Sequence, residues 1–137
     1  GLAGNIGKSF AWQVAENKHD IYVLELSSFQ LDGIINYKPH IAILTNISPD
    51  HLDRYNYDYS LYINSKFRIT KNQTEADYLI YDNEDEAIQN WLKNNAIKAN
   101  KVPFSLVTKP ENEGGFLEEN NMNTKLKTKY LLCQSTN

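Results

Sequence analysis

Two polar segments, each following a short apolar stretch, carry the residue types in this chain that are best suited to chemistry. Glu25 closes the apolar residues 21–24, and Asp50 and His51 follow the apolar residues 41–44. If both stretches are parallel strands, their carboxyl ends meet at one edge of the sheet, where open α/β sheets build their sites. Carboxylate oxygen is the usual ligand of a hard divalent cation beside phosphates, and imidazole is a tolerated one. The sequence therefore predicts a metal site that contains Glu25 and His51.

Glu25 is the first candidate because it stands near the end of an otherwise apolar strand. Burying a carboxylate costs several kcal/mol unless it is paired, and a metal ion would account for its presence. A salt bridge to a lysine or arginine is the alternative. His51 is flanked by two aspartates, which could orient its imidazole, whereas we expect His19 and His40 to be surface residues.

Strand and helix patterns alternate along the chain, which predicts right-handed crossovers in a mainly parallel α/β sheet with helices on both faces. The continuous apolar character of residues 21–26 predicts a strand buried on both faces. Residues 109–129, rich in Asn, Glu and Lys, predict a loop or a loose β hairpin at the domain edge. The expected strands are residues 21–26, 41–46, 78–81 and 102–107, and the expected helices are residues 8–18, 58–71 and 84–98, with a short one inside 27–36.

Composition narrows the classes of function. The chain has 137 residues, 41% hydrophobic and 23% charged, with a net charge of −3, so we expect one domain and no nucleic-acid partner. Its apolar runs are too short to insert into a membrane. The single cysteine, Cys133, has no internal partner for a disulfide, which indicates a cytoplasmic protein. The oligomeric state is not indicated.

The start of the chain imitates a phosphate-binding P-loop. Gly7-Lys8-Ser9 fits the end of the pattern G-x-x-x-x-G-K-[ST], but that pattern needs glycine where Leu2 stands. A P-loop also follows a strand, and we predict no strand before Gly4. We therefore expect a simple glycine turn, and we interpret the chain as part of a longer protein whose first strand lies outside it.

Four segments together resemble the Mur ligases of bacterial cell-wall synthesis, in that family's order and spacing over roughly residues 1–100. The segments are Gly4-Asn5-Ile6-Gly7, residues 25–31, residues 45–55 and Lys66-Phe67-Arg68-Ile69. The resemblance implies a P-loop-type mononucleotide-binding central domain that lacks its first strand and its P-loop. Residues 1–108 would form this incomplete ATPase-type domain, and residues 109–137 would form an edge hairpin and a tail unlike the family.

The resemblance also implies roles for single residues. In that family, two magnesium ions bridge the phosphates of ATP, and a lysine carbamylated by CO₂ supports the second ion. Without the resemblance, Lys66 would be a surface lysine, and Ser27 and Gln30 would be ordinary polar turn residues. The positions that match are Glu25, His51 and carbamylated Lys66 at the metal ions, as the catalytic set, and Asn5, Ser27 and Gln30 at the muramoyl substrate.

The Ser-Ser-Phe-Gln segment after Glu25 resembles the family member that joins D-glutamate to UDP-N-acetylmuramoyl-L-alanine. The implied reaction passes through an acyl phosphate and serves peptidoglycan synthesis, and hence cell shape and division. We expect the 137-residue chain alone to be inactive. A sister ligase adding another amino acid, a metal-dependent phosphohydrolase and a non-catalytic α/β binding module are the alternatives.

Overall fold

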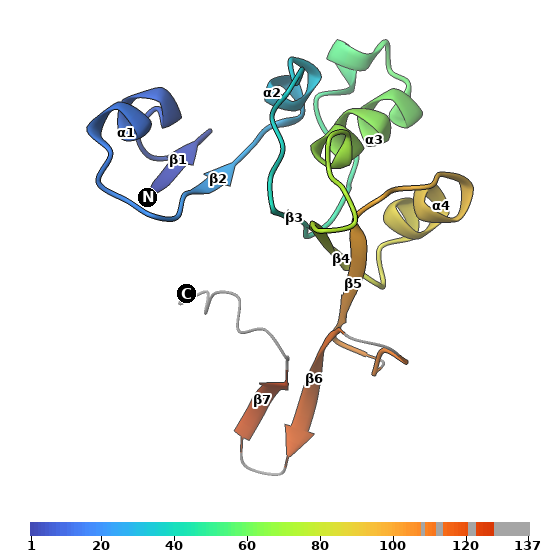
Figure 1. The fold of residues 1–137 in the computed structure, drawn as a ribbon. Coiled ribbons are helices and arrows are strands. Elements are labelled where there is room, and N and C mark those ends of the chain that lie inside the picture. Colours follow the sequence, from blue (N-terminus) through green and yellow to red (C-terminus); the bar gives the residue numbers. More distant parts are fainter. Residues whose placement is uncertain (108, 112–113, 121–122, 128–137) are drawn as a thin grey trace.

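The computed structural model describes residues 1–107, 109–111, 114–120 and 123–127. Helices and strands alternate in these residues up to β5, and strands follow (Figure 1). The strands are β1 (Leu2–Gly4), β2 (Val23–Glu25), β3 (Ile41–Leu44), β4 (Tyr78–Asp82), β5 (Asn100–Ser105), β6 (Gly115–Asn120) and β7 (Asn123–Lys127). The helices are α1 (Phe10–Glu16), α2 (Ser28–Asp32), α3 (Tyr59–Phe67) and α4 (Glu86–Asn94), with the 3₁₀ turns η1 (Leu52–Tyr55) and η2 (Arg68–Thr70).

The described strands form two sheets. β1 and β2 pair in parallel with each other, and β3-β4-β5-β6-β7 form a second sheet that is parallel up to β6. β7 closes it as the antiparallel partner of β6, so the hairpin expected in residues 109–129 is present. The predicted α/β fold with mainly parallel strands is therefore confirmed.

The core lies between the second sheet and helices α3 and α4. Alternate residues of the strands point to it, since successive side chains of a strand face opposite sides. The buried cluster includes Ala42 and Leu44 from β3, Leu79 and Tyr81 from β4, Tyr62 and Phe67 from α3, and Ile88 from α4. The intervening Ile41 and Ile43 of β3 are 39% and 47% exposed.

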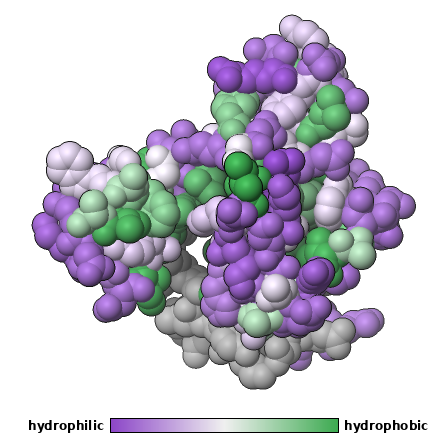
Figure 2. All heavy atoms as spheres, turned by 45° about the horizontal axis from the view of Figure 1, so that its top comes forward, coloured by the Kyte–Doolittle hydropathy of each residue, from purple (hydrophilic) through white to green (hydrophobic). Residues whose placement is uncertain are grey.

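The first sheet differs from two expectations. A strand, β1, does precede the glycine turn, and three residues are too few for a periodic pattern to reveal it. The prediction that residues 21–26 are buried on both faces is wrong, because Ile21 is 76% and Val23 54% exposed. In the described residues β2 pairs with β1, and no second layer covers these side chains. Exposed apolar side chains also gather on α1 and β1 (Figure 2).

Side-chain caps fix where the later helices begin. Asp58 accepts the backbone N–H of Ser60 at 2.8 Å at the start of α3, and Asp85 accepts that of Ile88 at 2.9 Å at the start of α4. The second carboxylate oxygen of Asp85 accepts the backbone N–H of Ile47 at 2.7 Å. This bond ties the start of α4 to the segment that follows β3.

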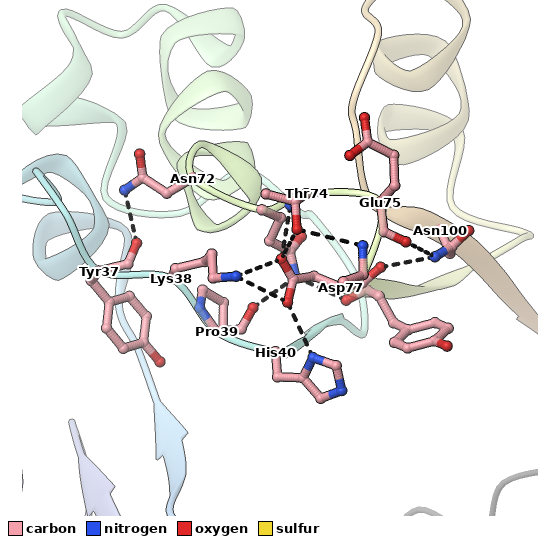
Figure 3. Close-up of polar contacts among 12 residues, drawn as sticks. Tyr37, Lys38, Pro39, His40, Asn72, Thr74, Glu75, Asp77 and Asn100 are labelled. Carbon is pink, nitrogen blue, oxygen red and sulfur yellow. Dashed lines mark hydrogen bonds and ion pairs between the residues drawn. The ribbon is translucent and has the colours of Figure 1, made fainter.

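A buried aspartate anchors the amino ends of β3 and β4. Asp77 accepts the backbone N–H and the hydroxyl of Thr74 at 2.8 and 2.9 Å, and contacts Lys38 Nζ and His40 Nδ1 at 3.1 Å each (Figure 3). The backbone bond from Thr74 and then the contact with His40 hold the pKa of Asp77 well below its usual range. His40 is 68% exposed, as a surface residue should be, but it is paired.

No helix in the described part of the chain combines the length and the apolar character needed to cross a membrane.

Candidate active site at the carboxyl ends of the strands

The structure places Asn5 and Glu25 side by side. Glu25 is the last residue of β2, and Gly4, the last residue of β1, lies opposite it in the parallel register. The chain continues into Asn5, whose backbone N–H donates to the Glu25 carbonyl oxygen at 2.7 Å. The amide side chain and the carboxylate therefore stand at the same sheet edge, where the ends of parallel strands build sites.

Gly4 allows this close approach. Its φ is +108°, and a Cβ at this position would stand 2.1 Å from the Glu25 carbonyl oxygen. Gly7 also has a positive φ, of +76°. The glycines therefore have a structural reason in the turn and in the contact between β1 and β2.

The carboxylate of Glu25 faces solvent. Glu25 is exposed, so the argument that a buried charge needs a partner does not apply to it. Within the described residues, its side chain makes no hydrogen bond or ion pair, which gives the salt-bridge alternative no support. An exposed, unpaired carboxylate at a strand end can accept a ligand without first breaking an internal contact.

Ser27 and Gln30 bind each other at the start of α2. The hydroxyl of Ser27 accepts the backbone N–H of Gln30 at 3.4 Å, and the carboxamide oxygen of Gln30 accepts the backbone N–H of Ser27 at 2.9 Å. This reciprocal pair is a capping box, which explains the three-residue spacing by helix initiation. The Gln30 side-chain nitrogen has no hydrogen-bond acceptor in the part of the chain described, so it can donate to a ligand.

His51 begins η1 in a left-handed backbone conformation, with φ of +49°. Such a conformation is uncommon for a non-glycine residue and marks a position fixed by its surroundings. Asp50 supplies part of that restraint, because its Oδ1 accepts the His51 backbone N–H at 2.8 Å and its Oδ2 lies 3.5 Å from His51 Nε2. Both side chains are exposed.

Phe29 connects the segment after β2 with the segment that holds His51. Its ring meets the His51 ring edge-on, with 5.3 Å between centroids, and stacks on Tyr55 at 6.3 Å. The guanidinium carbon of Arg54 lies 4.3 Å from the Phe29 centroid. Their contact joins the two polar segments of the sequence.

Lys66 lies on α3, half-buried, with Nζ 5.3 Å from the centroid of the Tyr62 ring. Burial raises the pKa of Tyr62, and the negative charge of Asp50 adds to the rise. Tyr62 therefore lies within electrostatic range of the segment that carries His51. Among the described residues Lys66 has no carboxylate partner, unlike an ion-paired surface lysine.

The side chains present supply only part of a metal site. In the described ranges no three His, Cys, Asp or Glu residues gather closely enough to hold an ion. Mg²⁺ usually takes one or two protein carboxylates and fills its remaining positions with water and substrate phosphates. Glu25 and His51 are each exposed and open to such an ion, and in the described residues neither belongs to a site closed by protein ligands.

Asn5 and Glu25 stand at the end of the sheet of β1 and β2, whereas His51 follows β3 of the second sheet, so the described strands do not bring Glu25 and His51 to one edge of one sheet as predicted. Parallel strands that end in such polar groups define an α/β protein with candidate ligand-binding residues at its strand ends. The chain belongs to the Mur ligase family, since the family model described as the Mur ligase middle domain matches residues 5–135. This confirms the family predicted from the four sequence segments.

Several relatives of this chain carry the name UDP-N-acetylmuramoylalanine--D-glutamate ligase. The protein of Christiangramia forsetii is 60% identical over 122 residues, which are 89% of this chain and 27% of the relative. That of Bacteroides fragilis is 55% identical over 119 residues, 87% of this chain and 27% of the relative. That of Macrococcus caseolyticus is 46% identical over 121 residues, 87% of this chain and 26% of the relative. The chain thus spans about a quarter of the length of these relatives.

The predicted division at residue 108 stays a prediction. The family match continues beyond that residue to residue 135. Cys133 and the last residues of the tail lie outside the described residues.

Proposed function

We propose that this chain is part of an ATP-dependent ligase that joins D-glutamate to UDP-N-acetylmuramoyl-L-alanine in peptidoglycan synthesis. The observation that carries the proposal is the pairing of Asn5 with Glu25 at the carboxyl edge of β1 and β2. It occurs in a chain 60% identical to a protein named for this ligation.

The chemistry has two steps. The carboxylate of UDP-N-acetylmuramoyl-L-alanine takes the γ-phosphoryl group of ATP, which forms an acyl phosphate and releases ADP. The amine of D-glutamate then attacks the acyl carbon, loses a proton and displaces inorganic phosphate, so that an amide bond forms. Two Mg²⁺ ions, when bound, would neutralise charge on the phosphoryl group in transfer.

The candidate site residues fall into two groups, one at the muramoyl substrate and one at the metal ions beside the phosphates. Asn5 and Gln30 have side-chain amides that can donate to the muramoyl substrate, and Ser27 holds Gln30 in place through the capping box. Glu25 and His51 are the candidate metal ligands, beside the phosphates. This is the catalytic set expected from the sequence, completed by Lys66.

Carbamylation of Lys66 is part of the proposal. Its amine would attack CO₂, form an N–C bond and lose a proton, which converts a cation into an anion. Two observations support it: Lys66 is half-buried, and in the described residues no carboxylate pairs with it. A carbamate there could support a cation near the His51 segment.

A cytoplasmic location also belongs to the proposal, because ATP and the nucleotide-linked precursor are cytoplasmic substrates. The sequence argument for it rests on Cys133, outside the described residues.

The test is phosphate release by the full-length protein that contains this chain. It is run with ATP, Mg²⁺ and UDP-N-acetylmuramoyl-L-alanine, with and without D-glutamate. Release that requires D-glutamate supports the proposal. Release that requires L-lysine or diaminopimelate instead would replace it with a sister ligase, and no release from a folded protein would contradict both.

The phosphohydrolase alternative gains no support from the geometry. It needs several acidic residues and His51 around one ion, and no such group of three is present in the described part of the chain.

A further inference from the structure

We propose that the hydroxyl group of Tyr55 is a positioning group that fixes the substrate-side helix α2 against the metal-side segments η1 and α3. This inference rests on the proposed function and adds to it a defined role for Tyr55, a residue outside the expected catalytic and substrate-binding sets. Tyr55 would act through Ser27, Gln30, His51 and Lys66 without touching substrate.

Tyr55 is buried at the end of η1, with 8% of its surface exposed. Its hydroxyl lies 2.8 Å from Asp32 Oδ2, on the last residue of α2, and 3.0 Å from Ser65 Oγ, on α3. Ser65 Oγ in turn donates to the backbone carbonyl of Ser28 at 2.9 Å, at the first turn of α2. One hydroxyl pair therefore bonds both ends of α2.

The protons can be assigned from the chemistry of the groups. An ionised carboxylate only accepts, so Tyr55 donates to Asp32. Ser65 donates its proton to the Ser28 carbonyl, so the Tyr55 proton is shared between Asp32 and the Ser65 oxygen. A hydrogen bond from a neutral hydroxyl to a charged acceptor is stronger than one between neutral groups. The Tyr55–Asp32 bond is therefore the firmest link in the network.

Each link stands next to a candidate site residue. Asp32 belongs to the five-residue helix whose capping box contains Ser27 and Gln30. Ser65 immediately precedes Lys66 on α3. Tyr55 lies in the same 3₁₀ turn whose cap is His51. The network therefore sets the distance between the substrate-side residues and the metal-side residues. Small changes in such distances lower the reaction rate strongly.

The hydroxyl of Tyr55 can be removed without losing the aromatic contacts of its ring. The Tyr55 ring stacks on Phe29 and meets Tyr62 edge-on at 5.5 Å. Tyr55→Phe keeps these ring contacts and removes only the bonds to Asp32 and Ser65. A matched control exists in Tyr81, which is 9% exposed and whose hydroxyl makes no hydrogen bond within the described residues.

The experiment compares full-length wild type, Tyr55→Phe and Tyr81→Phe in the phosphate-release assay. For Tyr55→Phe we expect the KM of UDP-N-acetylmuramoyl-L-alanine to rise and kcat to fall, together about tenfold in kcat/KM, with the KM of D-glutamate unchanged. Tyr81→Phe should match wild type. Asp32→Ala should reproduce Tyr55→Phe without adding to it in the double variant, whereas Asp32→Asn, which keeps an acceptor, should restore most of the activity.

Amide hydrogen exchange provides a readout that does not depend on activity. Exchange in residues 28–32 should be faster in Tyr55→Phe and in Asp32→Ala than in wild type, and unchanged in Tyr81→Phe. Unaltered kinetics or unaltered exchange in Tyr55→Phe would overturn the inference. If wild type shows no phosphate release dependent on D-glutamate, the proposed function fails, and the exchange comparison by itself decides whether Tyr55 holds α2.

Discussion

Replacing Gly4 with alanine should separate β1 from β2 and displace Glu25. The new Cβ would stand 2.1 Å from the Glu25 carbonyl oxygen, whereas real Cβ contacts stay above 3.0 Å, so the two backbones must move apart by about 1 Å. Alanine at φ of +108° adds strain of about 1–3 kcal/mol. The hydrogen bond from Asn5 to Glu25 contributes about 1 kcal/mol more when it is lost. We expect Gly4→Ala to destabilise the protein by about 2–4 kcal/mol.

Gly33 provides the control for this substitution. It caps α2 with φ of −82°, and a Cβ there would meet nothing closer than the Gln30 carbonyl oxygen at 3.7 Å. Alanine fits that conformation, so Gly33→Ala should be neutral or more stable by about 0.4–1 kcal/mol through a less flexible unfolded chain.

Both variants are to be made in the full-length protein and compared by urea unfolding and by D-glutamate-dependent phosphate release. A displacement of about 1 Å at Glu25 should lower the rate about 100-fold in Gly4→Ala, and Gly33→Ala should keep the wild-type rate. Equal stability and equal rates in the two variants would refute the argument from the contact between Gly4 and Glu25.

Three further predictions concern the buried carboxylate, the proposed carbamate and the core. The depressed pKa of Asp77 means that its ionised form stabilises the fold above the unfolded pKa of about 3.8, and that this stabilisation is lost as pH falls further. The difference in urea midpoint between wild type and Asp77→Asn should thus be full at neutral pH and shrink below about pH 4; a difference independent of pH would contradict it. Lys66→Arg keeps the cation but prevents carbamylation, so phosphate release should fall roughly 10–100-fold and a ¹³C-carbamate signal seen in wild type should vanish; full activity would exclude the carbamate. Leu79→Ala, at a side chain with 0% exposure, should lower the free energy of unfolding by about 2–5 kcal/mol, and a smaller loss would mean that β4 is not the centre of the core.

Strands β3 and β4 of the second sheet were predictable because each is a short, mainly apolar block. Residues 41–46 and 78–81 were predicted as strands, and β3 and β4 occupy them within two residues. Helix ends were less accurate. Residues 84–98 were predicted as one helix, yet α4 ends at Asn94, because the apolar spacing does not mark where Asn95 adopts an extended backbone.

The site was partly predictable, since strand ends bring local segments to one edge. That logic placed Glu25 and His51 at one sheet edge, whereas β2 and β3 lie in different sheets of the described residues, and it missed β1, which brings Asn5 to Glu25. It did not anticipate the Tyr55 network, whose partner Asp32 is 23 residues away in sequence. No periodicity links an acid at a helix end to a tyrosine in a 3₁₀ turn, so only tertiary packing brings them together.

The small size of the sheet of β1 and β2 determines how ligand binding would change local motion in the protein. Two short strands are marginally stable without covering layers, and the exposure of Val23 shows how little apolar contact supports β2 on one side. Local opening of this pair would therefore need less free energy than unfolding of β4 within the core. A ligand bound between Asn5 and Glu25 would oppose that opening by mass action. Ligand binding would therefore first reduce local opening of β1 and β2. The sheet edge that carries the Glu25 carboxylate is then also the edge whose rigidity depends on a bound ligand.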